Sequence, residues 1–249
     1  MSEAQAYCQT VVRDADRDRY LASLFAPDAA RPHLLSLYLF NAEVARIAQT
    51  VSEPQLGLIR HQWWLDTLEA MEQGQAPAHP VAQALAETAR THRLPIEPLR
   101  QLVIAREADL YDDPPSDLPA LEAHLGATSS VLIQLAALIL AGPKASACAE
   151  AAGYAGVAYG LATALVHPRP RPLPPGMDRD AAMTHARSRL KQAREAARAI
   201  PRAALPAFLP ASLTGLYLAA AERSPEAPRQ PSQFRRQLTM WWRARGDRF

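Results

Sequence analysis

Glycine, cysteine and β-branched residues are scarce in this sequence. It contains 10 glycines and two cysteines among 249 residues, but 22 prolines. Scarce glycine and β-branched residues, with abundant alanine, leucine and arginine, disfavour a β-sandwich or barrel and favour helices. The two cysteines, Cys8 and Cys148, are too few for a disulfide framework and form no CxxC metal site. We therefore expect an all-α protein of a reducing compartment.

The motifs of several functional classes are also missing. The sequence contains no GxSxG, P-loop or GxGxxG motif, which argues against a serine hydrolase, an NTPase and a dinucleotide-binding enzyme. Its seven histidines form no HxxxH or HExxH pair, so no zinc site is expected. No nucleic-acid reading module is recognisable, and nucleic acid is not an expected partner.

Targeting and membrane-spanning segments are not expected either. The first 20 residues lack the apolar core of a secretory signal and are too acidic for a transit peptide. Two uncharged stretches, residues 151–167 and 203–221, are short or interrupted by proline and glycine, which favours buried core helices over membrane spans. We therefore expect a soluble, cytoplasmic protein.

Prolines divide the chain into about ten helical segments. Single helices are expected over residues 4–25, 117–141 and 202–221, and a further helix should begin with Ser52 as its N-cap. The proline-rich stretch 167–176 should be a loop. One all-α domain over residues 1–249 is the simplest organisation.

Two local clusters could carry chemistry. Asp109 lies one helical turn from Asp112 and Asp113, so two of these carboxylates could share a divalent cation, or all three could be solvated at a helix end. Trp63 and Trp64 point about 100° apart on a helix. We expect Trp64 in the core and Trp63 at its rim.

The charge is distributed unevenly. Residues 1–168 carry a net charge of −8 and residues 169–249 a net charge of +10. The basic part could face a membrane surface, an acidic partner or the acidic part of the same chain. Part of it forms a stripe along one helix face, at steps of three and four residues: Arg187, Lys191, Arg194, Arg198 and Arg202.

Residues 230–249 should contain a basic amphipathic helix. An apolar side carries Phe234, Leu238, Trp241 and Trp242, and a basic side carries Arg235, Arg236 and Arg243. Such a helix is typical of a membrane interface, but it could also pack its tryptophan face onto the domain. Both alternatives remain open at this point.

A family resemblance extends over roughly residues 20–220. The segments that carry it are SLYLFNAEVARIAQTVSEPQLGLIRHQWWLDTLEAM (36–71), HPVAQAL (79–85), READL (106–110), LEAHL (121–125) and GYAGVAYGLATAL (153–165). They resemble the squalene/phytoene synthase family. This resemblance implies a single helical bundle of the isoprenoid synthase type around a central cavity. In that family, two aspartate-rich motifs hold Mg²⁺, which grips the diphosphate of prenyl substrates.

The chain departs from this family at both aspartate-rich motifs. Where the first motif has acids, this sequence has Ala45, Arg46 and Gln49. Where the second has Gln, Asn, Arg and two Asp, this sequence has, in that order, Gly160, Thr163, Val166, His167 and Arg171. Because Mg²⁺ requires oxygen ligands, we expect a cavity lined by these positions to hold no metal and to catalyse no condensation.

A narrower resemblance fits these departures. It is to the branch of the superfamily whose members assist assembly of respiratory complex I, the NADH:ubiquinone oxidoreductase. The matching residues are Phe40, Asn41, Glu43, Ser52, Glu53, Arg60, Gln62 and Trp64, followed by HPVA at 79–82. The resemblance implies a catalytically silent protein with complex I subunits or assembly intermediates as partners. Together with the basic, tryptophan-bearing C-terminus, it predicts a peripheral location on the inner face of a respiratory membrane, at an anionic lipid surface. Because no targeting segment is expected, we expect a bacterial cytoplasmic protein.

Two alternative functions remain. One is a squalene/phytoene synthase-type prenyltransferase that uses Mg²⁺ and recruits acids from elsewhere: Asp66, Glu69, Asp109 and Asp112. The other is a carrier whose cavity binds an isoprenoid or quinone lipid without chemistry.

Overall fold

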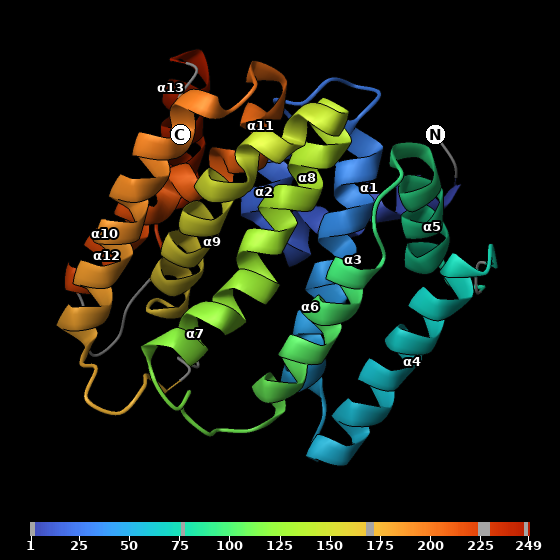
Figure 1. Cartoon of the computed structure of the whole chain (residues 1–249), viewed down its shortest axis with the longest axis horizontal. Coiled ribbons are helices and arrows are strands. Elements are labelled where there is room, and N and C mark those ends of the chain that lie inside the picture. Colours follow the sequence, from blue (N-terminus) through green and yellow to red (C-terminus); the bar gives the residue numbers. More distant parts are fainter. Residues whose placement is uncertain (1–2, 76–77, 168–171, 224–229, 247–248) are drawn as a thin grey trace. The chain divides into compact units, whose positions relative to one another are not determined.

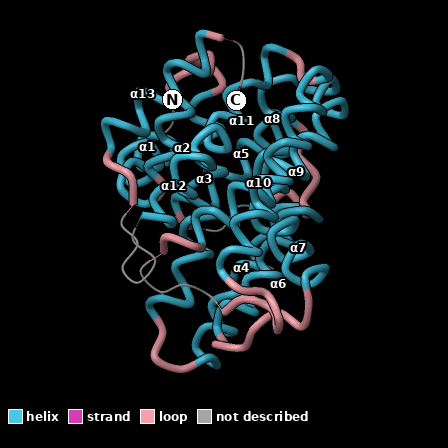
Figure 2. The backbone as a smooth tube through the Cα atoms, turned by 90° about the vertical axis from the view of Figure 1, so that its left-hand side faces the viewer, coloured by secondary structure: helices cyan, strands magenta, loops and turns pink. Residues whose placement is uncertain are grey.

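The computed structural model describes residues 3–75, 78–167, 172–223, 230–246 and 249. This described part consists of helices joined by loops and contains no strand (Figure 2). The predicted all-α fold is therefore confirmed. The chain divides into two compact units, Met1–Asp112 and Asp113–Phe249.

The first unit is built around one long apolar helix. Its elements are α1 (Glu3–Ala15), α2 (Arg17–Ser23), α3 (Arg31–Thr50), α4 (Pro54–Glu72), α5 (Pro80–His92), α6 (Glu97–Glu107) and the 3-10 turn η1 (Ala108–Leu110). Helix α3 packs against α1, α4 and α5. Leu34, Leu37, Phe40 and Val44 recur on α3 at helical spacing and are buried in these contacts.

Two helix boundaries in the first unit differ from the prediction. Residues 4–25 form two helices because Asp16 leaves helical geometry and caps α2, its side chain accepting a hydrogen bond from the backbone N–H of Arg19 at 3.1 Å. Helix α4 has Glu53 as its N-cap residue, without a side-chain cap bond. The prediction of Ser52 as N-cap is therefore wrong.

The second unit is centred on an alanine-rich helix. Its elements are α7 (Leu118–Leu125), the π-helical turn η2 (Gly126–Ser130), α8 (Val131–Ala141), η3 (Gly142–Cys148), α9 (Ala149–Ala164), α10 (Arg179–Ala196), η4 (Ala197–Ala199), η5 (Arg202–Ala204), α11 (Leu205–Phe208), η6 (Leu209–Leu213), α12 (Thr214–Arg223) and α13 (Gln233–Arg245). Helix α10, orange in Figure 1, lies alongside α9. Helix α9 also packs against η2 and α12. Small residues allow these close approaches.

Two expected single helices in this unit are interrupted. The helix over 117–141 contains the π-turn η2. At this turn α9 approaches so closely that a Cβ at Gly156 would lie 2.3 Å from the Cα of Ser130. The helix over 202–221 is divided into short pieces, because Pro206 and Pro210 each start a new one.

Two helical stretches of the second unit have the length and apolar composition of membrane spans. They are Leu118–Ala164 and Arg202–Arg223. The most apolar 18-residue window is 61% buried within the protein in the first stretch and 67% buried in the second. This burial is what core helices of a folded unit show. It agrees with the prediction made for residues 151–167 and 203–221.

Candidate functional site

The segment that corresponds to the first aspartate-rich motif of the family lies on the C-terminal half of α3. Ala45 is half-buried, and Arg46 and Gln49 are exposed. Glu43 is the one acid in this segment; burial raises its pKa, and His79 and Arg46 partly oppose that rise. None of the three predicted positions supplies a carboxylate.

The segment that corresponds to the second aspartate-rich motif lies on α9 and just beyond its end. The Thr163 hydroxyl donates to the backbone carbonyls of its own helix, Tyr159 at 2.9 Å and Gly160 at 3.0 Å. Gly160 faces α7, where an added Cβ would lie 2.9 Å from Leu125 Cδ2. These positions serve helix packing. His167 is half-buried, and Arg171 lies outside the described residues.

These positions do not suit Mg²⁺. Ala45, Gly160 and Val166 have no side-chain donor atom. Over the described ranges, no group of three or more His, Cys, Asp or Glu side chains is placed to hold a metal ion. Two of the four acids considered as replacements have other partners: Asp109 accepts from Arg106 at 2.9 Å, and Asp66 accepts from Gln62 at 2.7 Å. Glu69 and Asp112 are exposed.

Part of the motif that carries the narrower resemblance, residues 40–64 and 79–82, forms one aromatic and acidic cluster in the first unit. The ring centroids of Phe40 and Trp64 are 5.0 Å apart, and those of Trp64 and His79 are 5.7 Å apart. His79 Nε2 lies 3.9 Å from a carboxylate oxygen of Glu43. Trp64 is 4% exposed and Trp63 is 41% exposed. The predicted core and rim roles of the two tryptophans are therefore confirmed.

The other residues of this motif have local roles on α3 and α4. Arg60 donates to the Thr50 hydroxyl at 3.0 Å, which ties the start of α4 to the end of α3. Gln62 bonds Asp66 along α4. Ser52 and Glu53 are exposed in the turn between the helices. None of these contacts forms a catalytic arrangement.

Buried polar atoms in the first unit escaped the sequence analysis. His61 is buried, and neither of its ring nitrogens has a hydrogen-bond partner of good geometry in the described structure; the same is true of Asn41 Oδ1. Burial lowers the pKa of His61, and the nearby Val44 carbonyl offsets this only in part. The periodicity of α4 could place His61 inside but could not reveal that its nitrogens lack partners.

The predicted basic stripe lines a groove in the second unit. Arg187, Lys191, Arg194 and Arg198 come from α10 and the turn η4, and the opposite wall comes from α12. The prediction is wrong for Arg202, which lies in the separate turn η5, beyond Pro201, and is not part of this lining. Burial lowers the pKa of Arg194, and the positive charge of Arg243 on α13 lowers it further. The groove and α13 therefore belong to one electropositive region.

Helix α13 exposes its apolar side. Phe234 is 72% exposed, Leu238 43%, Trp241 42% and Trp242 66%. The buried residue of this helix is Met240. The alternative in which the tryptophan face packs onto the domain is therefore wrong.

The arginines of α13 also differ from the predicted division into two sides. Arg236 is half-buried and donates to the Tyr217 hydroxyl of α12 at 3.4 Å, and Arg243 is half-buried as well. Arg235 is exposed. Two of the three arginines thus lie on the side of the helix that packs against the unit.

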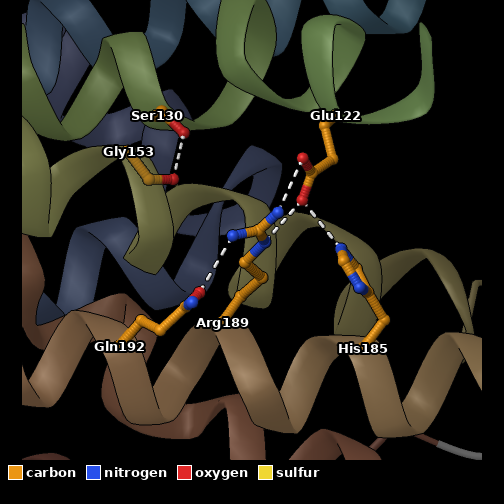
Figure 3. Close-up of polar contacts among 6 residues, drawn as sticks. All are labelled: Glu122, Ser130, Gly153, His185, Arg189 and Gln192. Atoms are coloured by element: carbon orange, nitrogen blue, oxygen red, sulfur yellow. Dashed lines mark hydrogen bonds and ion pairs between the residues drawn. The ribbon is translucent and has the colours of Figure 1, made fainter. Parts of the chain in front are cut away.

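An ion-paired cluster joins α7 to α10 (Figure 3). Glu122 accepts from Arg189 at 2.5 and 2.9 Å and contacts His185 at 2.7 Å. Burial alone would raise the pKa of Glu122, but the hydrogen bonds from Arg189 and His185 together hold it below the usual range. Arg189 also reaches Gln192 at 2.9 Å. The sequence analysis missed this cluster because Glu122 is more than 60 residues from its partners along the chain.

Comparison with known proteins gives two groups of relatives. The profile of the squalene/phytoene synthase family matches residues 12–167. NADH dehydrogenase (ubiquinone) complex I, assembly factor 6, from Homo sapiens is 35% identical over 159 residues, which are 64% of this chain and 47% of that protein. The same protein from Bos taurus is 34% identical over 164 residues, which are 66% of this chain and 49% of that protein. The chain thus spans about half the length of these relatives.

Two solved structures with the same fold are a squalene synthase and a dehydrosqualene synthase. Squalene synthase HpnC from Alicyclobacillus acidocaldarius matches with a TM-score of 0.75 and 19% identity, over 90% of this chain and 95% of that one. A dehydrosqualene synthase matches with a TM-score of 0.77 and 15% identity, over 96% and 95%. At this identity the likeness establishes the fold alone.

Proposed function

Because the chain belongs to the squalene/phytoene synthase family, we propose that it is a catalytically silent member that assists assembly of respiratory complex I at a membrane. The observation that carries this proposal is the similarity to complex I assembly factor 6 in two mammals. The residues that match the family profile, 12–167, include the resemblance motif around Phe40 and Trp64. About half of each relative has no counterpart in this chain. The role in complex I assembly is therefore a proposal for this chain.

The residues at the two motif positions support the absence of catalysis. Departure of a diphosphate requires neutralisation by cations, and Mg²⁺ is held by carboxylates. Ala45 and Gly160 offer no ligand atom, and the Thr163 hydroxyl is already bonded to its own helix. Two of the acids that could replace the motif are bonded elsewhere, Asp109 to Arg106 and Asp66 to Gln62. No cofactor is therefore part of the proposal.

The exposed side of α13 supports action at a membrane surface. Tryptophan and phenylalanine favour the boundary between lipid headgroups and acyl chains, and neighbouring arginines are attracted to anionic lipid. Phe234 and Trp242 are the most exposed large apolar side chains of α13. The cytoplasmic face of the inner membrane, and a bacterial cell, remain predictions from the sequence.

A diphosphate-release assay tests the catalytic part of this proposal. The chain is incubated with farnesyl or geranylgeranyl diphosphate and Mg²⁺ or Mn²⁺, beside an active squalene synthase. No turnover is expected under conditions where the active enzyme consumes its substrate. Sustained metal-dependent turnover would favour the prenyltransferase alternative and contradict the proposal.

A further inference from the structure

The groove between α10 and α12 is a cavity of about 430 Å³ that is open to solvent. Its size is typical of a small-ligand pocket. Leu190 and Leu218 contribute to its lining and are buried. The cavity therefore combines an apolar floor with a basic wall, all within the second unit.

The basic wall carries more positive charge than its acids neutralise. Arg187 is ion-paired with Glu222, and Lys191 lies 3.9 Å from Glu195. Arg194 and Arg198 complete the wall. Neither of these two has an ion pair within the described ranges, so the cavity has two cations available for an anion.

Gly215 keeps the opposite wall open. A Cβ added at this position on α12 would have no atom within 4 Å. The glycine is not needed for a left-handed backbone, since its φ is not positive. A larger side chain at Gly215 would therefore enter the cavity rather than disturb the helix packing.

We propose that this cavity binds the phosphate group of an anionic lipid headgroup. Planar guanidinium groups such as those of Arg194 and Arg198 form strong paired hydrogen bonds with phosphate oxygens. The apolar floor would accept the glycerol and the first methylenes of the lipid. This inference rests on the proposed action at a membrane, because the charge of Arg243 connects the groove to α13.

Binding of soluble probes tests the inference. The probes are inorganic phosphate, glycerol phosphate and short-chain dihexanoyl phosphatidylglycerol, measured by calorimetry with the whole chain. The test variants are the double variant Arg194→Gln/Arg198→Gln, which removes the free cations, and Gly215→Leu, which fills the space. The matched control is Arg223→Gln, at the end of the same α12 but outside the lining. Helix content by circular dichroism confirms folding.

The expected result is that the native chain binds the short-chain lipid and that each test variant binds it at least about tenfold more weakly. The double variant loses paired charge-assisted bonds, and the leucine of Gly215→Leu occupies the space of the ligand. Arg223→Gln should bind the lipid as the native chain does. The inference is overturned if the native chain does not bind the lipid, or if both test variants bind it as the native chain does. Equal affinity for glycerol phosphate would overturn the lipid assignment in favour of a free phosphate compound.

Vesicle binding separates this inference from the proposed function. If the test variants bind the soluble lipid normally while vesicle binding still depends on α13, the headgroup site is wrong and membrane action stands. If the native chain binds the soluble lipid through Arg194 and Arg198 but no vesicles, the site stands and the membrane part of the proposed function is wrong.

Discussion

The guanidinium carbon of Arg245 lies 4.5 Å from the centre of the Trp241 ring, on the exposed side of α13. The Trp241 and Trp242 rings meet edge to face, with centroids 5.7 Å apart. A cation over an indole face is stabilised by the ring quadrupole. This arrangement holds basic and aromatic groups together at the surface, as an interfacial membrane helix does.

Replacing Phe234 and Trp242 by serine should weaken binding to anionic vesicles. Burial of each large apolar side chain contributes about 1.5–3 kcal/mol, so the double variant should lose at least about tenfold in partitioning. Co-sedimentation with phosphatidylglycerol vesicles measures this. Folding should be unaffected, because both side chains are exposed.

A matched change in the first unit provides the control. Leu56 and Ile59 on α4 are also exposed, and the double variant Leu56→Ser/Ile59→Ser should bind vesicles as the native chain does. Native binding should also fall as salt rises from about 50 to 500 mM, because attraction to anionic lipid is screened. Equal losses in both double variants would argue against α13 as the membrane surface.

Gly156→Ala should destabilise the second unit strongly. The added Cβ would collide with the backbone of Ser130, and the repacking should cost about 1–3 kcal/mol or more. Gly153→Ala on the same helix has open space and should be neutral or slightly stabilising, since alanine favours helix. Urea unfolding of the two variants tests the contrast, and similar midpoints would contradict it.

Glu122→Gln should lower the free energy of unfolding at neutral pH by about 1–2 kcal/mol, because it removes charge-assisted bonds to Arg189 that are partly screened by solvent. The lowered pKa of Glu122 means that its contribution is complete above the usual glutamate pKa. That contribution is lost as the pH falls through the lowered value. The difference from the native chain should therefore disappear in acid.

The exposed Glu150 of α9 supplies the control for this variant. Urea unfolding of Glu150→Gln should differ from that of the native chain by less than about 0.5 kcal/mol. A Glu122→Gln deficit that persists unchanged at about pH 3 would show that the ion pairs are not its cause.

The first unit should lose stability as the pH falls below about 6.5. Burial lowers the pKa values of His33, His61 and His92 in the folded state. The unfolded chain then binds protons that the folded chain does not, so acid favours unfolding. Replacing His61 by leucine should reduce the loss between about pH 8 and pH 5 by up to about 2 kcal/mol.

Thermal unfolding of the native chain and of His61→Leu across this range measures the effect. Because the ring nitrogens of His61 have no partner of good geometry in the described structure, the variant should be at least as stable as the native chain at about pH 8. An unchanged pH dependence would show that His61 does not contribute to it.

Features with a local sequence pattern were predictable, and features set by distant residues were not. Helical periodicity placed Trp64 in the core and Trp63 at the rim, and it placed Arg187, Lys191 and Arg194 of α10 on one face. The same periodicity gave α13 two sides but could not decide which one packs, because that depends on Tyr217 and other residues of the second unit.

Interruptions of helices show the same limit. The break at Asp16 comes with a competing cap, and the π-turn before Val131 lies where Gly156 of another helix approaches Ser130 closely. The bonds of Glu122 to Arg189 join residues 67 positions apart. No local window of sequence contains both partners of such contacts.

The most direct test of the proposed function is the respiratory activity of membranes from source cells that lack this chain. NADH-dependent electron transfer to ubiquinone is measured, with succinate oxidation as the internal control, before and after the native chain is restored. The account predicts loss of most NADH-dependent transfer and of assembled complex I, unchanged succinate oxidation, and recovery on restoration. Normal complex I together with the loss of a prenyl product would contradict it.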